Sequence, residues 1–69
     1  MPGNFLRRWV AANVEPVPAQ GRNDQVAIWA AHCITDAMLN GISPDDIEEA
    51  AGGDVRTYLR KAADDVARG

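Results

Sequence analysis

Apolar residues recur along most of the chain at intervals of three and four, the spacing of one face of an α-helix. Four segments show this pattern: residues 5–13, 24–40, 44–51 and 55–67. No segment shows the strict alternation of apolar and polar residues that indicates a half-buried strand. The pattern therefore predicts an all-α fold, a single small domain of four helices over residues 1–69.

The first two helices are separated by a segment rich in proline. We expect Asn4 to be the N-cap of the first helix, because its side chain can accept a hydrogen bond from a free backbone N–H. The apolar side of that helix then consists of Phe5, Leu6, Trp9, Val10 and Ala12. Pro16 and Pro18 follow in residues 14–22 and favour an extended, stiff connector there.

The second helix carries apolar residues on two sides. We expect Asn23 to cap it and Gly41 to end it in a left-handed conformation. One broad face consists of Val26, Trp29, Ala30, Cys33, Ile34 and Ala37. Ile28 and Leu39 lie nearly opposite that face, beside His32. Either this pair packs under the first helix or the connector, or it is kept exposed for a partner.

The C-terminal half has the clearest helix signals. Ser43 is the expected N-cap of the third helix, Pro44 takes its first position, and Asp46 occupies the capping-box position. Two glycines then precede Asp54, the expected cap of the fourth helix. Its apolar face consists of Val55, Tyr58, Leu59, Ala62, Ala63 and Val66. Two short helices joined by a glycine turn predict a helix-turn-helix-like arrangement.

Composition limits the classes of function. The net charge is −3, with a balance of +2 in residues 1–22 and −5 in residues 23–69. Nucleic-acid binding depends on neutralising phosphates, so an acidic chain argues against it. Cys33 is the only cysteine, which excludes an internal disulfide and suits a reducing compartment. Without a signal-peptide pattern or a membrane-length apolar run, we expect a cytoplasmic protein with no membrane partner.

The chain offers little for catalysis or metal binding. His32 and Cys33 are neighbours on a helix, so their side chains point about 100° apart and cannot readily work as a base and a nucleophile. One histidine and one cysteine cannot make a structural zinc site. The carboxylates of residues 45–49 lack the order of a calcium loop. We therefore expect no enzyme, no metal and no cofactor.

One alternative is a DNA-binding regulator. Arg56 and Arg60 share a face of the fourth helix, and Lys61 is close by, as in a recognition helix flanked by phosphate contacts. However, Asp54 stands at the end that would enter the groove, and the preceding helix carries four acids and no base. The arginines can equally pair with surface acids, each pair contributing ~0.2–1 kcal/mol.

Two stretches resemble a known family. "NFLRRWVAANV" at 4–14 and "GISPDDIEEAAGGDVRTYLRKAADD" at 41–65 are similar to short rhizobial proteins grouped as a domain of unknown function. Proteins of this kind are common on mobile symbiosis islands, where one class acts as antiactivators of quorum sensing and conjugative transfer. The resemblance implies a regulator that works by protein contact, and it brings no catalytic residues.

The sequence thus favours a small regulatory module that binds a protein, with a transcriptional activator as the expected partner. A chain this short buries only ~60% of its unfolded surface, so a partner or a second copy would help to stabilise it. The expected apolar contact is formed by Ile28, Leu39 and His32, joined by Trp9 if the first helix does not bury it. The expected acidic contact, selecting a basic surface, consists of Asp45, Asp46, Glu48 and Glu49.

Overall fold

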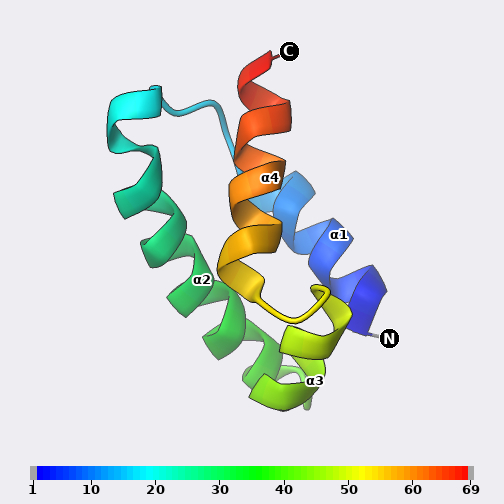
Figure 1. The fold of residues 1–69 in the computed structure, drawn as a ribbon. Helices are drawn as coiled ribbons and strands as arrows, with labels where there is room; N and C mark the ends of the chain where they lie inside the picture. The colour runs from blue at the N-terminus through cyan, green and yellow to red at the C-terminus, as the bar shows by residue number, and fades with distance from the viewer. Residues whose placement is uncertain (1, 69) are drawn as a thin grey trace.

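The computed structural model describes residues 2–68, which form four α-helices, one 3₁₀ turn and no strand (Figure 1). The elements in order are α1 (Pro2–Asn13), η1 (Ala19–Gly21), α2 (Arg22–Leu39), α3 (Pro44–Ala50) and α4 (Val55–Arg68). The prediction of an all-α fold is confirmed. The predicted helix bounds agree to within three residues, the largest difference being the start of α1.

The helices pack around α2, the longest of them. α4 packs mainly against α2, while α3 lies against α1 and α2 (Figure 1). The buried residues form one core: Leu6, Trp9, Val14, Val26, Trp29, Ala30, Cys33, Ala37, Ile47, Val55, Leu59 and Ala63. Nearly all of them are positions that the helical periodicity assigned to an inner face, because burial of one apolar stripe per helix is what stabilises such a fold. The helix-turn-helix-like relation between α3 and α4 stays a prediction.

Glycines end α2 and α3 in the same way. Gly41 has a φ of 78°, its N–H donates to the carbonyl of Met38 at 3.0 Å, and the next N–H, of Ile42, donates to that of Ala37 at 2.9 Å. This is the Schellman pattern, which satisfies the free carbonyls at a helix end. Gly52 and Gly53 repeat it after α3, also with positive φ. The predicted stop at Gly41 is confirmed.

Two predicted caps are confirmed at the helix starts. The Ser43 hydroxyl accepts from the backbone N–H of Asp46 at 3.1 Å, with Pro44 in the first turn. The Asp54 carboxylate accepts from the backbone N–H of Arg56 at 3.3 Å and from the hydroxyl of Thr57. Both caps satisfy donors that a helix leaves free at its N-terminus.

The other two predicted caps were wrong. α1 begins at Pro2, a residue whose fixed φ suits the first helical position, so Asn4 lies inside the helix and accepts from the Arg7 guanidinium instead. α2 begins at Arg22 with Gly21 before it and no side-chain cap. Asn23 therefore lies within the first turn, where its side chain accepts from the Arg60 guanidinium.

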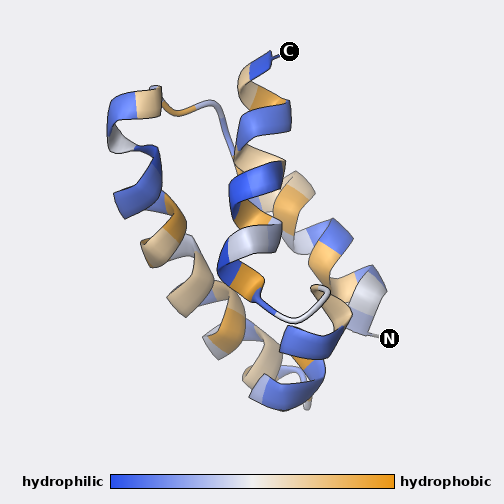
Figure 2. Ribbon diagram, in the orientation of Figure 1, coloured by the Kyte–Doolittle hydropathy of each residue, from blue (hydrophilic) through white to orange (hydrophobic). Residues whose placement is uncertain are grey.

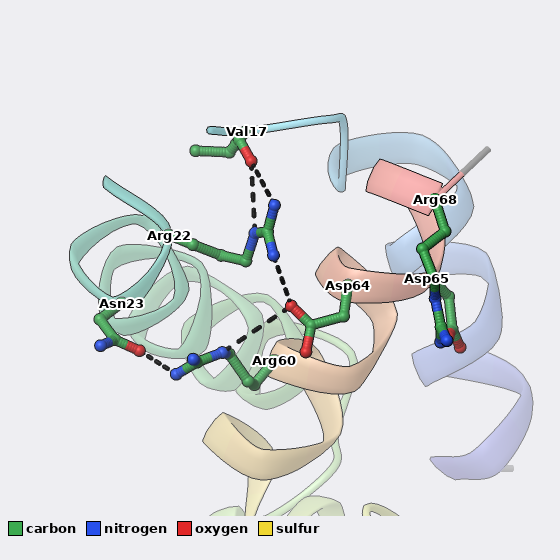
Figure 3. A network of polar contacts seen from close by, with 7 residues as sticks. All are labelled: Val17, Arg22, Asn23, Arg60, Asp64, Asp65 and Arg68. Carbon is green, nitrogen blue, oxygen red and sulfur yellow. Dashed lines mark hydrogen bonds and ion pairs between the residues drawn. The ribbon is translucent and has the colours of Figure 1, made fainter. Parts of the chain in front are cut away.

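The connector is only partly extended. Residues 19–21 form the 3₁₀ turn, which the two prolines did not predict. Arg22 holds the connector in place: its Nε and Nη2 donate to the Val17 carbonyl at 3.2 and 2.9 Å, and its Nη1 donates to Asp64 Oδ1 at 2.8 Å (Figure 3). A single side chain thus joins the connector, the start of α2 and α4.

Candidate functional site

The exposed large apolar side chains of residues 2–68 all belong to α2. Ile28 is 52% exposed, Met38 57% and Leu39 80%. At 100° and 1.5 Å per residue, Ile28 and Leu39 lie about 20° apart around the helix and about 16 Å apart along it. The pair does not pack under α1 or the connector. Of the two alternatives left open by the sequence, the exposed one is observed.

These residues belong to two neighbouring lines along α2, each with the spacing i, i+4, i+7, i+11. One line consists of Ile28, His32, Thr35 and Leu39, and all four are exposed. The other consists of Ala27, Ala31, Ile34 and Met38, of which Ala31 and Met38 are exposed. Ala27 and Ile34 are half-buried, and Ile34 packs against the core, as its place on the inner face predicted. Figure 2 shows blue at the first turn of α2 and mainly tan to orange colours further along the helix. We call these eight residues the outer surface of α2.

The outer surface of α2 carries no Asp, Glu, Lys or Arg, and His32 is its one titratable side chain. The one acid between Ile28 and Leu39 is Asp36, which is half-buried and accepts from the indole Nε1 of Trp9 at 2.8 Å. Met38 was not among the predicted contact residues, because it lies on neither the broad inner face nor the line of Ile28 and Leu39. The second line, read at helical spacing, was the signal that could have found it.

Trp9 does not join this surface. It is 6% exposed and lies in the core, and its one polar atom is satisfied by Asp36. A buried tryptophan with a partner for its N–H is a structural residue. The sequence predicted a role for Trp9 in partner binding only if α1 left it exposed, and it is buried.

The acids proposed to select a partner differ in their surroundings. Asp45, Asp46 and Glu49 are exposed on α3, as expected for a solvated acidic surface. Glu48 is half-buried, and its Oε2 accepts from the backbone N–H of Val55 at 3.3 Å. Glu48 therefore also caps the start of α4, a role that its position in the sequence did not show.

A groove runs between α2 and the first half of α4, and Ala27, Ala31 and Ile34 of the outer surface line it. One hollow of about 300 Å³ is lined by Asn23, Val26, Ala27, Arg56, Thr57 and Arg60. A second of about 270 Å³ is lined by Ala27, Ala30, Ala31, Ile34, Glu48, Asp54, Val55 and Arg56. Ala27 and Arg56 line both, so the two hollows adjoin. We call them together the α2–α4 groove.

The three basic residues of the DNA-binding alternative do not act as one patch. Arg56 and Arg60 both line the groove. Arg60 is occupied, since it donates to the Asn23 side chain and its Nε lies 3.9 Å from Asp64 Oδ1 (Figure 3). Lys61 is exposed and lies about 100° around the helix from Arg60. The structure brings two of the three together.

Cys33 and His32, the two residues considered for catalysis, have different surroundings. Cys33 is fully buried, and burial together with the nearby Asp36 raises the pKa of its thiol from 9.0 to about 11. A thiol with a raised pKa is a poor nucleophile at neutral pH. His32 is exposed on the next position of α2. Within residues 2–68, no three His, Cys, Asp or Glu side chains gather closely enough to hold a metal ion.

None of the helices in residues 2–68 combines the length and the apolar character needed to cross a membrane. No family model, no curated protein and no solved structure matches the chain. The resemblance to the rhizobial family therefore stays a prediction.

Proposed function

We propose that this protein is a regulatory module that binds another protein through the outer surface of α2. The observation that supports it is that Ile28, Met38 and Leu39, the three large apolar side chains left exposed in residues 2–68, share one helix. Single exposed apolar residues scattered over a surface need no explanation, but three on one helix, with no Asp, Glu, Lys or Arg on the same surface, are typical of a binding surface.

The proposed action is inhibition by sequestration of a transcriptional activator. Contact with Ile28 and Leu39 supplies apolar burial, and the exposed acids Asp45, Asp46 and Glu49 favour a basic surface on the partner and speed its approach. The activator as target rests on the resemblance to the rhizobial family alone. The site contributes the mode of binding, and the resemblance contributes the class of partner.

The test is affinity capture from native cell extract with nuclease added, followed by mass spectrometry. We expect the tagged protein to recover a transcriptional activator, and the double variant Ile28→Gln/Leu39→Gln to lose it. Ala11→Gln/Ala12→Gln, which changes two exposed positions of α1, is the matched control and should keep it. Equal recovery by both double variants would contradict the proposal.

The alternative, a DNA-binding regulator, is favoured by one observation, the shared position of Arg56 and Arg60 at the groove. The salt dependence of binding distinguishes the two functions. Binding to phosphates weakens steeply between about 50 and 200 mM salt, whereas an apolar contact changes little. Binding that survives 200 mM salt and nuclease supports the protein partner. Binding that is lost at 200 mM salt, lost on nuclease treatment and lost in Arg56→Gln/Arg60→Gln supports a DNA-binding function.

A further inference from the structure

We propose that the α2–α4 groove receives a single amphipathic helix of the partner, and that this helix runs antiparallel to α2. The inference rests on the proposed function, because it assigns a shape and a direction to the element that the partner contributes. It follows from the small side chains of the groove floor and from the order of charges along its wall.

The floor of the groove allows close approach of a helix. Ala27, Ala30 and Ala31 line it, and none of them extends beyond Cβ. Ile34 lines the same hollow, and the exposed Met38 follows one turn later on the same line of α2. A line of small residues that ends in larger ones forms a shallow groove along a helix. The apolar ridge of a second helix can pack into such a groove.

The charges along the wall of the groove change sign from one end to the other. Arg60 lines only the hollow beside the start of α2, and Asp54 and Glu48 line only the hollow nearer its end. Arg56 stands between them and lines both hollows. Arg56 makes no ion pair within residues 2–68. The two carboxylates accept backbone N–H bonds at the start of α4 and still present negative charge to the groove.

This order of charges selects one direction for a bound helix. The N-terminus of a helix carries partial positive charge and its C-terminus partial negative charge. A helix antiparallel to α2 places its N-terminus toward Asp54 and Glu48 and its C-terminus toward Arg56 and Arg60. Basic side chains in its first half and acidic ones in its second half strengthen the same direction.

A second copy of this chain fits the groove poorly. Its own α2 is the helix with an exposed apolar surface, but an antiparallel α2 would bring the exposed Asp24 of its first turn toward Asp54 and Glu48. That helix has no lysine or arginine after Arg22, which is bonded to Val17 and Asp64. The one acid of its last turn, Asp36, is half-buried and accepts from Trp9. The charges therefore favour a different chain.

The probe is a pair of synthetic helices of about five turns, each stapled on its polar face to equalise helicity and each with one leucine stripe. The first carries lysines in its first half and glutamates in its second half, and the other has the reverse order. Nitroxide labels at the peptide N-terminus report direction through broadening of amide signals in the full-length protein. We expect the first peptide to bind about fivefold more tightly than the second, and its label to broaden the amides of residues 52–55 more than those of residues 22–24.

Two variants of the full chain complete the experiment. Ala31→Gln fills the exposed middle of the floor with a good helix former, and we expect it to weaken peptide binding about tenfold or more. Ala11→Gln on the exposed side of α1 is its control and should bind as the unchanged protein does, with circular dichroism confirming that both fold.

Three results would overturn the inference: no binding of either peptide below about 1 mM, equal binding of both, or concentration-dependent dimerisation that Ala31→Gln abolishes. None of them decides the proposed function. If the protein still captures an activator through Ile28 and Leu39, the function stands and only the helical, antiparallel mode of binding is wrong.

Discussion

The two sides of α2 have similar apolar residues and different surroundings. On the inner side, Trp29, Cys33 and Ala37 are buried against the other helices. On the outer side, Ile28 and Leu39 face solvent over the same length of helix. Residue type alone does not distinguish isoleucine or leucine on one side from valine or tryptophan on the other. What distinguishes them is whether a neighbouring helix supplies a matching apolar stripe.

The comparison shows why one side of α2 stays exposed. α4 and α1 each offer one apolar stripe, and both stripes are used against the inner side of α2 or the adjoining core. Within residues 2–68, no further helix covers the exposed outer side. Ile28, Met38 and Leu39 are more than half exposed there and contribute little to the stability of the isolated chain, in keeping with the proposed role in binding.

The largest expected effect comes from the inner side. Trp29→Ala removes a large buried side chain and leaves a cavity, which costs about 3–5 kcal/mol in the free energy of unfolding. A domain of this size has little more than that to lose, so we expect the variant to be largely unfolded at 25 °C. Urea unfolding followed by circular dichroism measures it. If Trp29→Ala lowered the free energy of unfolding as little as an outer-side variant does, the inner side of α2 would not be the side that stabilises the fold.

A smaller effect is expected at the edge between the two sides, where Trp9 donates to Asp36. Trp9→Phe keeps an aromatic ring in the core but leaves the carboxylate without its donor, at a cost of about 1–3 kcal/mol. Asp36→Asn retains an oxygen acceptor and should cost less. If the two variants have the same unfolding free energy as the unchanged protein, the bond does not help to hold α1 on α2.

The inner side also responds to alkaline pH through Cys33. The unfolded thiol ionises near pH 9.0, but burial holds the pKa at about 11 in the folded protein. The neutral thiol therefore contributes stability that is fully present below pH 9 and is lost as pH rises toward 11. Comparing urea midpoints of the protein and Cys33→Ala between pH 8 and 10.5 isolates this contribution. If the urea midpoints of the two proteins changed with pH in the same way, the fold would not raise the pKa of the Cys33 thiol.

The smallest effect on stability is expected on the outer side. Ile28→Gln/Leu39→Gln changes only exposed groups, and surface changes of this kind usually stay within about 0.5 kcal/mol per site. Urea unfolding should give nearly the same midpoint as the unchanged protein, while partner capture is lost. Unfolding of this variant would mean that the pair contributes to the core.

The sequence predicts the fold better than it predicts the surface. Helical spacing identified the buried positions, and Ser43, Gly41 and Asp54 were recognised because each satisfies free backbone groups within a few residues of chain. Asn23 was misassigned because its partner, Arg60, is 37 residues away. Contacts of that range depend on how the helices pack, which a local pattern does not contain.

The same limit applies to the candidate site. Ile28 and Leu39 were found because both depart from the inner face of one helix, which is a local property. The groove was not found, since Ala27 and Ala31 lie on α2 while Arg56 lies on α4. Glu48 was read as a surface acid, but it also caps the next helix. Whether Trp9 was free to bind depended on burial by other helices.

The most direct test of the account compares two surfaces of the protein in one capture experiment. Ile28→Gln/Leu39→Gln removes the apolar contact, and Arg56→Gln/Arg60→Gln removes the positive charge at the groove. With nuclease present, the account predicts that the first variant loses the protein partner about tenfold or more, while the second retains it to within about fivefold. Retention by the first variant and loss by the second would contradict it and would place binding on α4 instead of α2.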